Sequence, residues 1–152
     1  MKQGLVLEEA GKFNKALNMY QTAKTNVKND SIAYNMINKR IEQIALLWMI
    51  RAEEMLNEGN YITAYNLVKT VSNFSIQGQK EIRRFKSWVI LGEGKKYQEL
   101  GFIGRAMEKY SEALELNTDL IYEIRSLQYQ AGVQMARLAD EADEFEEIQL
   151  AI

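Results

Sequence analysis

Few side chains in this sequence are of the types that carry out catalysis. The 152 residues include no histidine and no cysteine, so the usual proton shuttle and the strongest side-chain nucleophile are both missing. The stretch from Gly4 to Lys12 lacks the glycine spacing of a phosphate-binding loop, and Phe13 stands where serine or threonine would bind magnesium. We therefore predict that the protein is not an enzyme.

Metal and cofactor chemistry has equally little support. One acidic cluster lacks the alternating ligands and central glycine of a calcium-binding loop. It is better interpreted as a solvated turn and helix surface, and it contains Asp140, Glu141, Asp143, Glu144, Glu146 and Glu147. We therefore expect no metal site and no cofactor.

The charge balance bears on the kind of partner. Nineteen Lys and Arg against 21 Asp and Glu give a net charge of -2, which lacks the positive field that binding to a nucleic acid requires. The apolar run from Ile44 to Ile50 is far shorter than the roughly 20 residues that span a bilayer, so we expect no membrane insertion.

No targeting pattern in the sequence indicates the compartment in which the protein acts. One basic stripe is either an ordinary solvated face or a contact for an acidic partner, and it consists of Lys80, Arg83, Arg84 and Lys86.

The elements that would position any binding residues are helices. The sequence has no proline and is rich in strong helix formers, which predicts helix throughout. Gly11, Gly59 and Gly101 each follow a polar helical stretch, and glycine ends a helix by adopting the left-handed conformation without steric cost. These three glycines are therefore predicted turns between helices.

An internal repeat surrounds those glycines. Three copies have a small residue on a first helix, then the turn, a large residue, alanine and another large residue, and a looser fourth copy has Ile148 at the place of the alanine. In the fourth copy Asp143 replaces the turn glycine. The copies read Gly4, Leu7, Gly11, Phe13, Ala16, Tyr20, Ala23; then Trp48, Ala52, Met55, Gly59, Tyr61, Ala64, Val68, Val71; then Ile90, Gly94, Tyr97, Gly101, Ile103, Ala106, Tyr110, Ala113; and Gly132, Ala136, Ala139, Asp143, Phe145, Ile148, Ile152.

This pattern resembles the tetratricopeptide repeat over most of the chain. The resemblance implies an all-α fold, a right-handed superhelical stack of antiparallel helix hairpins, with about 3.5 repeats here. The period departs from the family's shorter unit, because Ala16 to Ala64 is 48 residues and Ala64 to Ala106 is 42. The long-unit variants of the family are therefore the nearest likeness.

The extra length predicts long first helices and short second helices. The first helices are expected at 31–58, 76–100 and 119–142, and the second at 14–27, 62–71 and 104–116. Ser31 and either Thr118 or Asp119 are the expected N-caps.

The domain interpretation is a single array over 1–152, with repeats at about 1–30, 31–74, 75–117 and 118–152. Both ends fall inside a repeat, so we expect an excerpt of a larger protein. Apolar residues near the end, Ile148, Leu150 and Ile152, are expected to be covered by further chain or to mediate self-association.

Helical arrays of this kind bind other proteins, so we expect an interaction module or scaffold that holds a peptide or protein segment on its concave face. The alternative is a structural spacer, or an array that assembles through its open ends. The family's clamp for acidic chaperone tails is absent, because its places hold Leu5, Ile50, Trp88 and Gly92. The predicted partner-binding residues lie on first helices and are Leu46, Met49, Glu53, Trp88, Leu91, Lys95, Gln98, Gln130, Val133 and Arg137.

Overall fold

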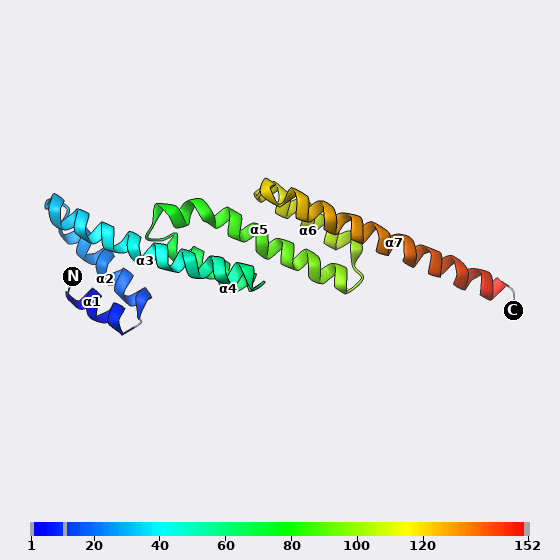
Figure 1. Ribbon diagram of the computed structural model, residues 1–152, viewed down its shortest axis with the longest axis horizontal. Helices are drawn as coiled ribbons and strands as arrows, with labels where there is room; N and C mark the ends of the chain where they lie inside the picture. The colour runs from blue at the N-terminus through cyan, green and yellow to red at the C-terminus, as the bar shows by residue number, and fades with distance from the viewer. Residues whose placement is uncertain (1, 11, 151–152) are drawn as a thin grey trace. The chain divides into compact units, whose positions relative to one another are not determined.

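The computed structural model describes residues 2–10 and 12–150, and the side chains of all of these except Glu9 and 144–150. Every regular element in this part of the chain is a helix and none is a strand, which confirms the all-α expectation (Figure 1). The superhelical stacking of hairpins stays a prediction. The elements are α1 (Lys2–Glu9), α2 (Phe13–Asn26), α3 (Ser31–Asn57), α4 (Tyr61–Val71), α5 (Ile76–Glu99), α6 (Ile103–Leu116), the 3-10 helix η1 (Thr118–Leu120) and α7 (Ile121–Leu150).

The chain divides into two compact units, Met1–Phe85 and Lys86–Ile152. The division falls inside α5, and therefore inside the predicted third repeat rather than between two repeats. Each unit has its own hydrophobic core.

The first unit is centred on the packing of α2 against α1 and α3, and of α4 against α3. Phe13 meets Trp48 edge to face, with ring centroids 6.2 Å apart. The start of α5 approaches the end of α4 so closely that a Cβ on Gly78 would lie 2.7 Å from the Ser72 backbone nitrogen. The buried residues of the α2–α3 core are Ala16, Leu17, Tyr20, Ile37, Ile41 and Ile44.

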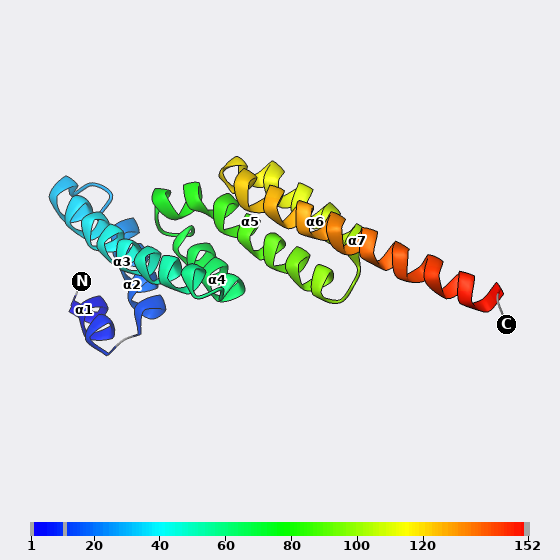
Figure 2. The ribbon, with the colours of Figure 1, turned by 45° about the vertical axis from the view of Figure 1, so that its right-hand side comes forward.

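The second unit contains the rest of α5, then α6, η1 and α7. In both ribbon views α6 and α7 run side by side, and the C-terminal part of α7 extends well past the first residue of α6 (Figures 1 and 2). Trp88, Tyr97 and Leu127 pack at the edge of this core, half-buried. Its buried residues are Ile90, Leu91, Ala106, Tyr110, Ala113, Leu120 and Ile124.

The predicted long and short helices are confirmed from α2 to α6, with bounds that agree within one residue. Two of the three turn glycines have the predicted left-handed backbone, with φ of 78° at Gly59 and 80° at Gly101. Gly11 lies outside the described residues.

The predicted helix starts need two corrections. The N-cap of α3 is Asp30 and not Ser31, because the Asp30 carboxylate accepts from the backbone N–H groups of Ile32 and Ala33. Before α7, neither Thr118 nor Asp119 caps the turn. The Asn117 side chain accepts from the Asp119 N–H and starts η1, which leads into α7.

The predicted turn at Asp143 is wrong. α7 continues without interruption to Leu150, so the fourth copy has no second helix up to that residue. No residue other than glycine has a positive φ in the described part of the chain. Aspartate pays a steric cost in the left-handed conformation that glycine avoids, and the surrounding Ala and Glu residues favour helix.

Candidate functional site

A close crossing of α5 and α6 forms the floor of the candidate site in the second unit. A Cβ on Gly94 would lie 2.6 Å from the Tyr110 ring, so only glycine admits this tyrosine at this position. The Tyr110 hydroxyl donates to Gln98 Oε1 at 2.6 Å. Burial raises the pKa of Tyr110, which keeps the hydroxyl protonated as a donor.

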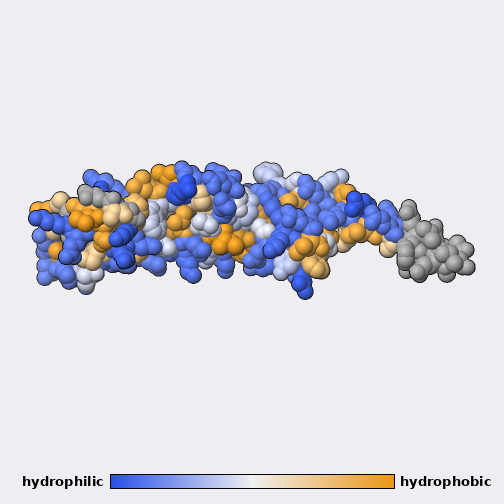
Figure 3. All heavy atoms as spheres, turned by 90° about the horizontal axis from the view of Figure 1, so that it is seen from below, coloured by the Kyte–Doolittle hydropathy of each residue, from blue (hydrophilic) through white to orange (hydrophobic). Residues whose placement is uncertain are grey.

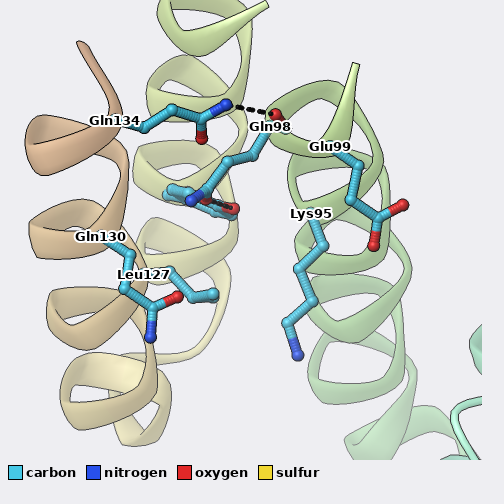
Figure 4. A pocket seen from close by; sticks show the side chains of 7 residues that line it. Lys95, Gln98, Glu99, Leu127, Gln130 and Gln134 are labelled. Carbon is cyan, nitrogen blue, oxygen red and sulfur yellow. Dashed lines mark hydrogen bonds between the residues drawn. The ribbon is translucent and has the colours of Figure 1, made fainter. Parts of the chain in front are cut away.

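A pocket of about 290 Å³ lies over this crossing, between α5, α6 and α7. Figure 4 shows the Gln98 side chain pointing from α5 toward the helix that carries Leu127, Gln130 and Gln134, whereas the Glu99 side chain points away from that helix. The Gln134 side chain donates to the Gln98 carbonyl at 3.4 Å and bridges the two helices across the rim. The lining residues are Lys95, Gln98, Glu99, Tyr110, Leu127, Gln130 and Gln134.

Carboxamides dominate the chemistry of this pocket. A glutamine side chain offers one acceptor oxygen and two N–H donors, so it pairs equally well with the N–H and the C=O of a peptide group. The two charged lining residues, Lys95 and Glu99, carry opposite charges, and Lys95 Nζ also lies 2.7 Å from Glu123 Oε1 outside the pocket. The pocket therefore suits a neutral polar ligand such as a polypeptide backbone better than an ion.

The first unit has the same contact between α1 and α2. A Cβ on Gly4 would lie 2.5 Å from the Tyr20 ring, and the Tyr20 hydroxyl donates to Glu8. Gly4 and Tyr20 are 16 residues apart, as are Gly94 and Tyr110. The acceptor precedes the tyrosine by 12 residues in both cases.

Here the acceptor is charged. Arg40 binds Glu8 through two atoms, with Nε 3.0 Å from Oε1 and Nη2 2.7 Å from Oε2. Desolvation and the Glu8 carboxylate raise the pKa of Tyr20 to about 12. A pocket of about 370 Å³ adjoins Tyr20, and its other lining residues are Leu5, Met36, Lys39, Arg40 and Gln43. These residues are more basic and more apolar than those of the pocket over the α5–α6 crossing, which we call the glutamine-lined pocket because Gln98, Gln130 and Gln134 line it.

In the hairpin of α3 and α4, which lies between these two contacts in the sequence, the glycine, the tyrosine and the polar acceptor are all replaced. The residues at the same spacings are Ala52 in place of glycine, Val68 in place of tyrosine, and Leu56 in place of the polar acceptor. All three are buried, and α3 packs against α4. A methyl group on the first helix thus accompanies a smaller residue on the second, with no polar acceptor where no hydroxyl needs one.

Three predicted partner-binding residues, Lys95, Gln98 and Gln130, line the glutamine-lined pocket. Val133 is 54% exposed on α7, and Arg137 is exposed and pairs with Glu141 at 3.3 Å. The other two predicted residues of this unit contribute to its core. Trp88 is half-buried and packs against the core, and Leu91 is fully buried within it. Leu91 is therefore removed from the proposed surface.

The predicted residues of the first unit do not meet in a pocket. Leu46 is 60% exposed, whereas Met49 is buried and is also removed from the proposed surface. Glu53 forms an ion pair with Arg84. Ile152 and the side chains of Ile148 and Leu150 lie outside the described residues, so the predicted self-association through them stays a prediction.

Sequence reasoning missed Glu99, Leu127 and Gln134, and it assigned Tyr110 only to packing. Gln134 follows Gln130 by one helical turn, so the shared face was a usable signal. Leu127 and Glu99 carried none, because their position depends on how α5 and α7 approach across α6.

Two features are absent from the part of the chain that the structure describes. It contains no group of acidic, histidine or cysteine side chains that could hold a metal ion. None of its helices has the length and apolar character needed to cross a membrane. On the face drawn in Figure 3, apolar patches are separated by hydrophilic side chains.

Comparison with known proteins adds no identification. The chain matches no protein-family model, no curated protein and no solved structure. The function is therefore inferred from the geometry of the chain's own residues.

Proposed function

We propose that the protein is a non-catalytic, tetratricopeptide-like interaction module that binds an extended peptide segment of a partner protein in the glutamine-lined pocket. The observation that carries this proposal is the convergence of Gln98, Gln130 and Gln134 from two facing helices on one hollow. The recurrence of the glycine–tyrosine contact with the same spacing supports a repeated hairpin design.

The pocket favours recognition of the peptide main chain. Gln130 is exposed and Gln134 half-buried, so carboxamide groups remain accessible to a ligand lying along α7. Leu127, which is half-buried, adds an apolar floor for one side chain. Main-chain hydrogen bonds would provide affinity and the floor would provide selectivity.

The test is selection of random linear peptides on the full chain, followed by fluorescence polarisation of the enriched peptides. Each glutamine hydrogen bond contributes about 0.5–1.5 kcal/mol. Replacing both Gln130 and Gln134 by alanine should therefore weaken binding by roughly tenfold. The matched control is Gln128→Ala, a glutamine on the same helix that does not line the pocket.

Equal binding by the double variant and the wild type would show that the selected peptides bind elsewhere. Sedimentation of the chain alone tests the alternative role. Concentration-dependent assembly without peptide, together with no enriched peptide, would favour a structural array.

A further inference from the structure

A second surface of α7 lies outside the glutamine-lined pocket. Tyr129 and Val133 are 75% and 54% exposed, and Ala136 is also exposed. These residues are spaced by four and three, which places them on one face of the helix.

The same face is buried on the two preceding long helices. A shift of 42 residues leads from these positions to α5, and a shift of 84 leads to α3. In α5 the small residue Gly94 is covered by Tyr110 of α6, and Leu91 is buried in the same core. In α3 the face lies on a helix that packs against α4. The six equivalent residues are all buried: Ser87, Leu91, Gly94, Ala45, Met49 and Ala52.

The residues that follow on the chain do not cover this face within the described part. α7 continues as one helix to Leu150, so residues 144–150 extend the helix that carries this face and do not fold back over it. We propose that this face, Tyr129, Val133 and Ala136, binds an amphipathic helix of a partner protein, antiparallel to α7, as α4 and α6 follow α3 and α5.

The pairing of residue sizes defines the contact side chain of that helix. Glycine on the first helix accompanies tyrosine at Gly4 and Gly94, whereas Ala52 accompanies Val68. Ala136 occupies the equivalent position on α7, and its methyl group would collide with a tyrosine ring. The partner helix therefore presents valine or isoleucine over Ala136.

Charge defines the start of the partner helix. Asp140 and Asp143 are exposed on α7 beyond Ala136 and continue the same helical spacing, whereas Glu141 pairs with Arg137. An antiparallel helix begins beside the two aspartates, so its positive N-terminal dipole and basic residues in its first turns meet their carboxylates. The occupant is thus a basic-start amphipathic helix and not an acidic segment.

The probe is a stapled helical peptide with the sequence of residues 60–72, which contains α4. It carries Ile62→Lys and Thr63→Lys to supply the basic start, because both positions are exposed in α4. We expect fluorescence anisotropy to show binding to the full chain, and Val133→Asp to weaken it by at least about tenfold. The matched control is Met135→Asp, on the same helix at a similar 58% exposure but about 200° round the axis.

A second probe that also carries Val68→Tyr tests the size rule. It should bind wild type at least about tenfold more weakly than the valine probe, and Ala136→Gly should reverse this preference. Unchanged binding with Val133→Asp, or an unaltered preference with Ala136→Gly, overturns the proposal. A dimer of the chain that Val133→Asp dissociates also overturns it, because the occupant is then a second copy. Gln130→Ala with Gln134→Ala leaves probe binding intact, so failure of the peptide pocket and failure of this surface are distinguishable.

Discussion

At the scale of single residues, the distance between α5 and α6 depends on the absence of one methyl group. The Gly94 position leaves no room for a Cβ beside Tyr110, and the nearest contact would be 2.6 Å. The ring cannot easily turn away, since its hydroxyl is bonded to Gln98. Packing and hydrogen bonding therefore fix the tyrosine together.

This arrangement predicts a compensating pair of substitutions. Gly94→Ala should destabilise the protein by about 1–3 kcal/mol through overpacking. Tyr110→Val in the same chain should recover part of that loss, because it recreates the Ala52 and Val68 combination. Urea denaturation of the two single variants and the double variant measures the coupling. The control is Gly104→Ala, where a Cβ meets nothing within 4 Å and helix propensity should make the change neutral or stabilising.

Tyr20 predicts a dependence of stability on alkaline pH. Its pKa is raised to about 12 in the folded protein, chiefly by desolvation and by Glu8, against about 10 in the unfolded chain. Between these values the folded state keeps a proton that the unfolded state releases. This contribution to the free energy of unfolding is complete below pH 10 and falls as pH rises, by at most about 1.4 kcal/mol per pH unit.

Replacing Tyr20 by phenylalanine removes that contribution. We expect the stability of Tyr20→Phe to fall less steeply than that of wild type when urea denaturation is repeated at several alkaline pH values. Tyr122→Phe is the control, since Tyr122 is 83% exposed. Parallel curves for Tyr20→Phe and wild type would contradict the raised pKa.

At the scale of helices, turn chemistry decides where hairpins form. Gly59 and Gly101 have φ near 80° and end α3 and α5. Asp143, at the equivalent place, leaves α7 unbroken. The contrast shows that the spacing of large and small residues does not make a turn by itself.

Reciprocal substitutions test this point. Gly101→Ala forces a side chain into the left-handed conformation and should cost about 1–2 kcal/mol. Residue 143 lies within α7, so Asp143→Gly should destabilise the helix by about 0.5 kcal/mol relative to aspartate and lower the helix content. Circular dichroism at 222 nm and thermal denaturation measure both effects. A gain in stability from Asp143→Gly would instead indicate a turn at that position.

The sequence predicted the helices well because its signals are local. The lack of proline, the glycine stops and the apolar spacing each act within a few residues, and α2 to α6 begin and end within one residue of expectation. It predicted the site only in part. Lys95, Gln98 and Gln130 share a face that periodicity identifies, but the burial of Leu91 and Met49 depends on packing between helices, which one sequence does not encode locally.

At the scale of the whole molecule, the chain has two compact units joined through one continuous helix, α5. Each unit has a separate buried cluster, one around Tyr20 and the other around Tyr110. In proteins whose helices contact mainly their neighbours in sequence, the loss of packing at one place promotes unfolding of the adjacent helices but not of distant ones.

Hydrogen exchange should therefore respond to core substitutions one unit at a time. Tyr110→Ala removes a large buried side chain, at a cost of about 3–5 kcal/mol, and should accelerate amide exchange in the described residues after Phe85. The amides of α2 and α3 should keep wild-type protection, because their core contains no residue of the second unit. Tyr20→Ala is the mirror experiment and should accelerate exchange in α2 and α3 while sparing α6. Equal acceleration of both units by either substitution would mean that α5 couples them into a single cooperative structure.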